Sequence, residues 1–417
     1  MFCRLTILSL GLAVCLILSG CSGAKETDEV AYVLAVGVDY LPNEQINITY
    51  LIAIPRALGT SGSGSNADRD KSVVITTIKA PSLAEGQSLL GASIGRAPNL
   101  SHVKVWIVSE ELARQGLENL VGPLLRFREF RGSMFMMVVR NTAQEFINKN
   151  KPSIEVLPSR WIEGLLLSGS ETGYLLPTHV HEFYNRLKTT SGAPYAVLAG
   201  INPLSGTDRP TANPIPPERA KEYLPGDIPR EGGNPAAVIG TAVFKGGKLA
   251  GMLTNEETRM MAILMGNFPK GFLTIIDPKK PERNVHILFR LGKDPQINVG
   301  FVNNRPVIDI DVLLEGELTS IASDINYESE DNRKLLEQEV SKTIKLEMVD
   351  MLNHTQALET DVVNFGRYFR PKFQTYDEVA SFNWNSLYPE AEIHVQINTK
   401  IRRTGLMFKS MPIRGND

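Results

Sequence analysis

The stretch that decides the fold is residues 30–39, Val-Ala-Tyr-Val-Leu-Ala-Val-Gly-Val-Asp. It is a nearly continuous apolar run that ends at Gly37 and Asp39, and such a run is typical of a buried strand. From Gln45 to Ile54 apolar residues alternate with polar or small ones, which predicts a second strand. The residues between the two runs are few enough for a tight turn. We therefore predict a β-hairpin over residues 30–54.

Strand and helix signals alternate through the rest of the first half. Ser109 is followed by two acids, a pattern that favours the positive end of a helix. Thr142 has Glu145 three residues later, which predicts a capping box at the start of a short helix. Apolar runs predict strands over 73–78, 103–108 and 134–139, and helical spacing predicts a helix over 81–94. This half is therefore predicted to mix α and β structure.

A proline-rich segment separates the two halves. Residues 203–235 carry eight of the 25 prolines in the chain, and a segment so rich in proline cannot form a long regular element. We predict a linker or a surface excursion over 205–235. The predicted organisation is a signal segment (1–21), an N-terminal α+β region of one or two subdomains (22–204), this segment, and a C-terminal α+β domain (236–417).

The second half begins with two apolar runs joined around Gly246-Gly247, which is a strong hairpin signal. Thr254 and Glu257 form a capping box for the next helix. Further strands are predicted over 285–291, 297–301, 307–314 and 393–401, and an amphipathic helix over 331–352. The predicted fold class is α+β and multidomain, with two to three domains, each a mixed or largely antiparallel β-sheet packed with α-helices.

The N-terminus carries the pattern of an export signal. Arg4 precedes an apolar run that is shorter than the ~20 residues of a spanning helix. Leu18-Ser19-Gly20-Cys21 then matches a lipobox, in which small residues admit the peptidase and the thiol takes the lipid. Cys3 and Cys15 leave with the signal, so Cys21 would be the one cysteine of the mature chain. We predict lipidation of Cys21 by a diacylglyceryl group and an N-acyl chain, with an ordinary signal peptide or an uncleaved anchor as alternatives.

The composition of the chain limits the classes of protein to which it can belong. A formal net charge of −2 gives no general reason to expect a nucleic-acid partner. With 42% hydrophobic and 22% charged residues the chain is ordinary globular protein. No second apolar stretch approaches ~20 residues. We therefore expect a soluble extracytoplasmic body attached to the membrane by the lipid alone.

Four stretches carry a resemblance to a known family. They are residues 31–39, residues 101–104 leading into 109–116, residues 240–251 with Glu257-Thr258, and Asp361 with Phe365-Gly366. In this order and behind a lipobox, the chain resembles the Ger(x)C family, the lipoprotein C subunits of bacterial spore germinant receptors. The family commonly has a tryptophan after the lipidated cysteine, whereas Ser22 and Gly23 follow here.

The resemblance implies a three-domain protein on the outer face of the spore inner membrane. It implies membrane-spanning A-type and B-type receptor subunits as partners, and a receptor that responds to nutrients by starting germination. The family has no known catalytic activity. The nutrient, the binding residues and the stoichiometry are left open.

The sequence itself offers few signs of catalysis. The sequence has no glycine-rich phosphate loop. His179 and His181 occupy alternate positions of a predicted strand and could begin a metal site, but two ligands are not a site, and ordinary hydrogen-bonding histidines are the alternative. Asp309 and Asp311 share one face of a predicted strand. They could form a catalytic carboxylate pair, or they could belong to a solvated edge. We predict no catalytic residue, no metal and no cofactor.

Two further segments could contact a partner. The methionines between Met260 and Met265 could form an adaptable binding surface, with core packing as the alternative. The last segment is basic and could face anionic lipid headgroups, or it could be a solvated tail. Its cations are Lys400, Arg402, Arg403, Lys409 and Arg414.

Three classes of function remain, namely a receptor accessory subunit, a lipid-anchored solute-binding protein of a transporter, and an envelope enzyme or chaperone. A solute-binding protein would show two similar α/β lobes with a ligand cleft. The antiparallel hairpins and unlike halves predicted here favour the accessory subunit.

Overall fold

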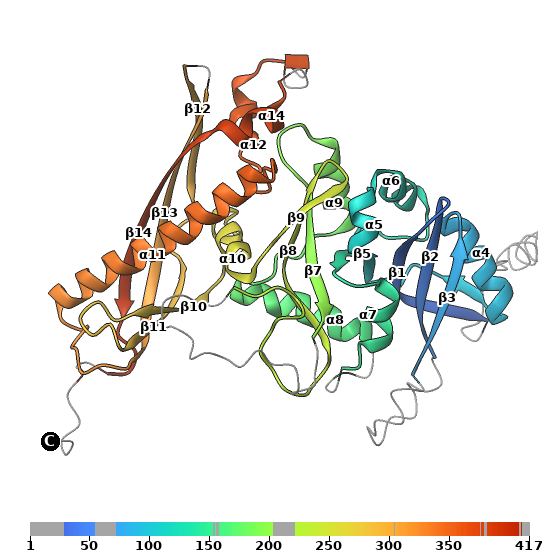
Figure 1. The fold of residues 1–417 in the computed structure, drawn as a ribbon, viewed down its shortest axis with the longest axis horizontal. Helices are drawn as coiled ribbons and strands as arrows, with labels where there is room; N and C mark the ends of the chain where they lie inside the picture. Colours follow the sequence, from blue (N-terminus) through green and yellow to red (C-terminus); the bar gives the residue numbers. More distant parts are fainter. Residues whose placement is uncertain are drawn as a thin grey trace, which may run out of the picture.

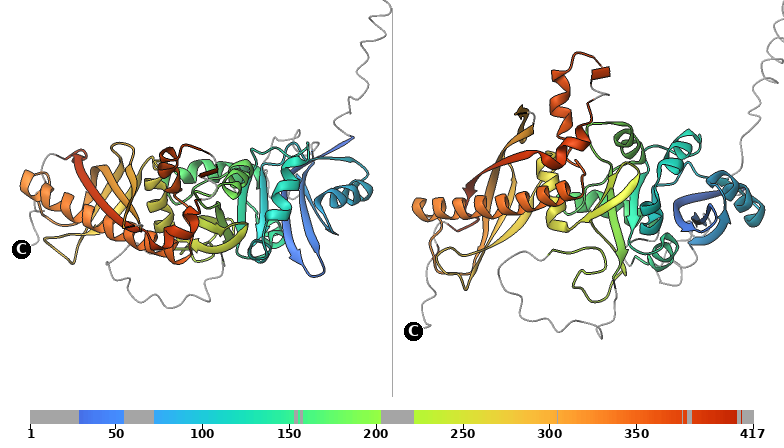
Figure 2. Two further views of the ribbon diagram at one scale, coloured as in Figure 1. Left: turned by 90° about the horizontal axis from the view of Figure 1, so that it is seen from above. Right: turned by 45° about the horizontal axis from the view of Figure 1, so that its top comes forward.

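The computed structural model describes residues 29–54, 72–152, 155, 158–202, 222–303, 305–375, 377–378, 382–407 and 410. Within these residues the strands form two sheets, which lie side by side along the long axis of the molecule (Figure 1). Both sheets are packed with helices, as two further views show (Figure 2). The predicted α+β multidomain class is confirmed.

The first sheet has nine strands in the order β3-β2-β1-β5-β6-β7-β8-β9, with β4 paired to β1. Its centre is parallel, from β1 through β5 and β6 to β7, and its outer strands pair antiparallel. The strands are β1 (Val30–Leu41), β2 (Gln45–Ala53), β3 (Val73–Ala80), β4 (Ala97–Asn99), β5 (Val105–Ser109), β6 (Phe135–Val139), β7 (Tyr195–Ile201), β8 (Ala236–Lys245) and β9 (Lys248–Leu253). The predicted hairpin is confirmed as β1 and β2, and Asn43 and Glu44 have positive φ in its turn.

Helices cover both faces of this sheet. Side chains of α4, α5, α6 and α9 pack into the core on one face, and those of α7 and α8 into the core on the other. The bounds are α4 (Leu83–Ile94), α5 (Glu110–Gln115), α6 (Glu118–Arg126), α7 (Ala143–Lys149), α8 (Pro158–Gly169), the 3-10 turn η1 (Ser170–Thr172) and α9 (Val180–Lys188). A sheet covered on both sides requires apolar strands without alternation, which explains the continuous run over residues 30–38.

The start of α7 is fixed to the centre of the sheet. The Asp39 carboxylate accepts hydrogen bonds from the backbone N–H groups of Ala143 (2.6 Å) and Gln144 (3.0 Å). A side chain at Gly37 would come within 2.7 Å of Ile147, so only glycine lets the helix approach β1 this closely. Thr142 caps the helix through the Glu145 N–H, but Glu145 pairs with Lys149 and does not return to the cap. Only half of the predicted capping box therefore forms.

The proline-rich segment leaves the sheet at the end of β7 and returns to it at the start of β8, the neighbouring strand. Its described part covers the carboxyl ends of β6 and β7. There Arg140 donates to the Pro225 carbonyl (2.7 Å). The side-chain amide of Asn202 donates to the Ile228 carbonyl and accepts from the Ile228 N–H. The hairpin around Gly246-Gly247 is confirmed as β8 and β9. The proline-rich segment therefore does not interrupt the sheet, because Ile201 at the end of β7 pairs with Ala236 at the start of β8.

The second sheet has five strands, in the order β10-β11-β13-β12 with β14 paired to β13. The long strand β13 pairs antiparallel with β11 and β12 and parallel with β14. The strands are β10 (Gly271–Ile276), β11 (Asn284–Leu291), β12 (Gln296–Val302), β13 (Arg305–Ile321) and β14 (Glu392–Arg403). Helices α10 (Asn255–Leu264) and α11 (Glu330–Ala357) fill the core of this half.

Short elements connect α11 to β14. They are α12 (Gly366–Phe369), the 3-10 turn η2 (Arg370–Lys372), α14 (Trp384–Leu387) and the 3-10 turn η3 (Tyr388–Glu390). The core beneath them also includes Tyr195 of β7 and Val243 of β8. One hydrophobic core therefore joins the two sheets.

Candidate functional site

Cys21 and the predicted signal segment, with the residues up to 28, lie outside the described residues. No helix in the described part of the chain combines the length and the apolar character needed to cross a membrane.

The two histidines weighed as metal ligands lie at the start of a helix and not on a strand. His179 precedes α9, where its backbone N–H donates to Glu182 (2.8 Å), and His181 lies in the first turn. The His179 ring contacts the Glu182 carboxylate (3.2 Å) and the His181 ring contacts the Gly132 carbonyl (2.8 Å). The strand geometry predicted for this pair was wrong, and each ring makes an ordinary hydrogen bond. Among the described residues no cluster of three or more His, Cys, Asp or Glu side chains forms a possible metal site.

Asp309 and Asp311 lie on one face of β13, as predicted, but each has a separate partner. Asp309 pairs with His394 (2.9 Å), and Asp311 accepts from the Asn398 amide (3.2 Å). The Asp309 side chain is 57% exposed. These contacts support the solvated edge, because each carboxylate has its own partner and the two do not form a buried pair. Both residues line a hollow of about 750 Å³, together with residues of β12, β14 and α11.

The basic residues of β14 are paired within the fold. Lys400 contacts Glu337 (3.3 Å), Arg402 contacts Glu315 (3.3 Å), and Arg403 lies 3.9 Å from Glu317. Lys409 and Arg414 lie outside the described residues. The described cations of this segment are therefore directed to carboxylates of β13 and α11, and this does not support a strip of cations free for lipid headgroups.

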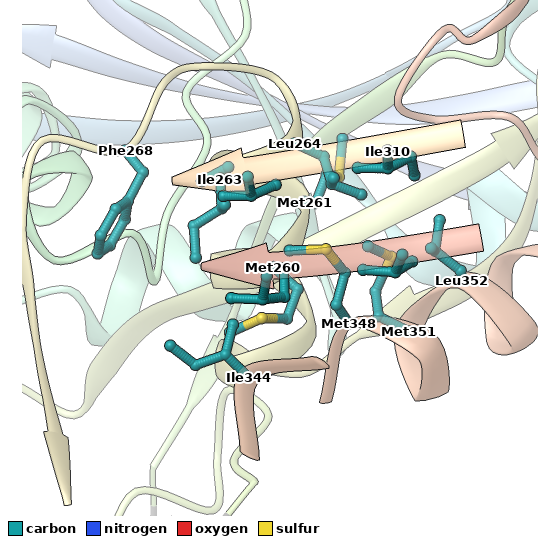
Figure 3. Close-up of a cluster of buried hydrophobic side chains, with 14 of the residues drawn as sticks. Met260, Met261, Ile263, Leu264, Phe268, Ile310, Ile344, Met348, Met351 and Leu352 are labelled. Atoms are coloured by element: carbon teal, nitrogen blue, oxygen red, sulfur yellow. The ribbon is translucent and has the colours of Figure 1, made fainter. Parts of the chain in front are cut away.

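The methionines of α10 belong to the core. Met260 and Met261 are fully buried and lie against Met348 of α11 and its neighbours (Figure 3). Core packing is confirmed over an adaptable binding surface for both residues.

Buried polar residues connect the two sheets at a place we call the junction, formed by Arg186, the segment 191–195, the segment 361–366 and Trp384. Arg186 of α9 donates to the carbonyls of Ala193 (3.0 Å) and Val362 (2.9 Å). The Asp361 carboxylate accepts from the Trp384 indole (2.7 Å) and from the Gly366 N–H (3.1 Å). Burial raises the pKa of Asp361. The hydrogen bonds of Asp361 at the junction are thus buried, and those of Arg186 are partly buried.

A second buried group lies on α10. Arg259 pairs with Glu256 at 2.8 Å, and their side chains are 2% and 5% exposed. The guanidinium lies 4.3 Å from the Tyr174 ring centre and 5.8 Å from that of Phe289, so it fills the space between η1 and β11. Burial raises the pKa of Glu256.

A third polar contact joins α10 to α11. His354 contacts the Glu257 carboxylate at 2.6 Å, and this hydrogen bond raises the pKa of His354. Glu257 also accepts from the Thr254 N–H (2.8 Å), so the predicted capping box of α10 is confirmed.

The four stretches that carry the resemblance therefore have structural roles. Asp39, Ser109 and Glu257 fix helix starts, and Asp361 organises the junction. Sequence reasoning missed Arg186 and Arg259. Arg186 donates to the distant Val362 carbonyl, and the rings that enclose Arg259 are also far away in the chain, although its ion-pair partner Glu256 is only three residues away. The available signal was a single arginine beside the apolar run 260–264 of α10.

Both halves of this two-sheet chain match family models of spore germination proteins. Residues 23–201 match "Spore germination protein N-terminal domain", and residues 239–405 match "Spore germination B3/ GerAC like, C-terminal". The class of protein is therefore a spore germination protein. The chain belongs to the Ger(x)C family, which confirms the resemblance.

Curated relatives come from Bacillus subtilis (strain 168). The putative spore germination protein YfkR is 21% identical, over 96% of this chain and 97% of the relative. Spore germination protein KC is 24% identical over 99% and 98%, and spore germination protein B3 is 23% identical over 94% and 96%. The crystal structure of the GerBC protein matches with a TM-score of 0.53 at 19% identity, covering 88% of this chain and 96% of that one, which shows a shared fold.

Proposed function

We propose that the chain is the lipid-anchored accessory subunit of a spore germinant receptor and is required for nutrient-triggered germination. It assembles with membrane-spanning A-type and B-type subunits on the outer face of the spore inner membrane and catalyses no reaction. The observation that carries the proposal is that both halves of the chain match spore germination families. These halves follow a lipobox that ends at Cys21.

The lipid would keep the folded body close to its partners. Residues 22–29, between Cys21 and the start of β1, can span at most about 30 Å. Two acyl chains give stable attachment, whereas one gives only reversible binding. Confinement to a layer of this depth raises the effective concentration of the subunit beside the membrane-spanning partners. The anchor therefore contributes to assembly without any contact of its own.

The transporter alternative has less support. It predicts two similar lobes, whereas the first sheet has nine strands with a parallel centre and the second has five strands around β13.

Deleting the coding region in the source organism tests the proposal. Mutant spores are exposed to single nutrients and the loss of optical density is followed. We expect germination to fail for at least one nutrient and to return when the gene is restored. Normal germination with every nutrient, in a strain that also lacks paralogues, would contradict the proposal.

The variant Cys21→Ala tests the anchor. We expect the protein to leave the membrane fraction, because it lacks the lipidated thiol, while its circular dichroism spectrum stays that of the folded body. Germination should weaken. Full germination with a demonstrably unattached protein would show that the tether is dispensable. Ser22→Ala, next to the anchor, is the matched control and should remain membrane-bound and active.

A further inference from the structure

Strand β14 is an edge strand, paired with β13 alone among the described strands. Successive backbone groups of a strand point to alternate sides, so every second N–H of β14 points away from β13. The outward groups are those of odd-numbered residues, because the Thr399 and Ile401 N–H groups donate to side chains of α11.

Helix α11 covers only part of this edge. The Ser341 hydroxyl accepts from Thr399 (3.1 Å) and the Glu337 carboxylate accepts from Ile401 (2.8 Å). Closer to the amino end of β14, the outward N–H groups of Val395 and Ile397 have no hydrogen-bond partner among the described residues. The edge is thus closed at its carboxyl end and open at its amino end.

The open stretch borders the hollow lined by Asp309 and Asp311. Residues 394–397 of β14 line this space of about 750 Å³, and Ser341, Lys342 and Lys345 of α11 line it as well. An unpaired strand edge along a hollow offers hydrogen bonds to an extended segment and space for its side chains.

Charges of both signs line the hollow. Asp309 and Asp311 of β13 are held by His394 and Asn398, so the lysines of α11 indicate the charge of the occupant. Lys342 is paired loosely with Glu339 on its own helix, at 3.6 Å. Lys345 is exposed and makes no ion pair with any described residue. A carboxylate on an added segment would complement this side of the hollow.

We propose that the amino-terminal part of β14 is a docking edge for an extended, acidic segment of a membrane-spanning receptor subunit. The segment adds a strand beside Val395 and Ile397, and one of its acidic side chains pairs with Lys345. This assignment rests on the proposed function, and it names the surface through which the subunit assembles.

Two variants of the full lipidated chain test the edge. Val395→Pro removes one outward N–H and leaves the bonds to β13, since proline is tolerated on the free side of an edge strand. Lys345→Glu reverses the charge beside the hollow. Lys334→Glu is the matched control, because it makes the same change on the same helix but does not line the hollow. Each tagged protein is purified from detergent-solubilised spore membranes, and co-purifying A-type and B-type subunits are quantified.

We expect Val395→Pro and Lys345→Glu each to lower the recovered subunits about fivefold or more, consistent with the loss of one hydrogen bond or one ion pair. Lys334→Glu should match the wild type. Amide hydrogen exchange at residues 393–398 should be slower in the complex than in the isolated chain, a readout that does not depend on a variant folding. A wild-type chain that recovers neither subunit overturns the proposed function and this surface with it. Normal recovery by both variants, with unchanged exchange, overturns the surface alone.

Discussion

At the scale of single residues, several buried polar contacts lie where the two sheets of this protein meet. Arg259 is the clearest case, because it neutralises Glu256 inside the core and also fills the space beside Tyr174. A buried charge that loses its partner costs far more than the pair contributes, so such residues cannot be changed singly.

The substitution Arg259→Ala should lower the free energy of unfolding by about 3–5 kcal/mol, since it leaves the buried Glu256 carboxylate without its charged partner and with only the hydrogen bonds from Tyr174 and Asn255. Urea denaturation of the purified body measures this. The double variant Arg259→Met/Glu256→Leu should recover most of the loss, because it removes both charges and keeps apolar volume. Equal destabilisation of the two variants would contradict the role assigned to the ion pair.

His354 makes stability depend on pH. Its hydrogen bond with Glu257 raises its pKa in the folded state, so protonation favours folding. The stabilisation is fully present below the unfolded pKa of about 6.5 and is lost as the pH rises through the higher folded value. The melting temperature should therefore fall from pH 6 to pH 8, and fall less in His354→Asn. Equal slopes for the wild type and the variant would argue against this contact.

At the scale of elements, local signals predicted most strands and helices well. The caps at Ser109 and Thr254 were predicted because a cap depends on residues three apart in the chain. The region around His179 was predicted wrongly as a strand. Histidine is an uncommon cap, yet Glu182 stands three residues later, which was the overlooked sign of a helix start. Arg186 and Arg259 could not have been placed, since no local pattern shows which distant element they face.

The capping box of α10 can be tested directly. Thr254→Ala removes the side chain that accepts from the Glu257 N–H and should cost about 1 kcal/mol of stability. Thr254→Ser keeps the hydroxyl and should cost less. Chemical denaturation of both variants gives the comparison. A serine variant as unstable as the alanine variant would show that packing, and not the cap, makes the difference.

At the scale of the whole molecule, sequence patterns could not give the order of the strands. The hairpin of β8 and β9 was predicted, but its pairing with β7 depends on contacts across the proline-rich segment. The fold class followed from the kinds of element present. The continuity of the first sheet, and the core that Tyr195 and Val243 share with the second, came only from the structure.

A shared core predicts that the two halves unfold together. Scanning calorimetry of the body should show one transition, with a calorimetric enthalpy equal to the van't Hoff enthalpy. Arg186→Ala should lower its temperature, because the Val362 carbonyl loses its partner at the junction. Two separate transitions in the wild-type chain would show that the halves are thermodynamically independent.

The position of β1 has a mechanical consequence. This strand follows the proposed anchor in the chain, and it lies inside the first sheet, paired with β2 on one side and with β4 and β5 on the other. A load applied through the lipid would pull along β1 and strain many hydrogen bonds at once in shear, whereas an edge strand would peel away one bond at a time. Tension from the membrane would thus be distributed across the sheet.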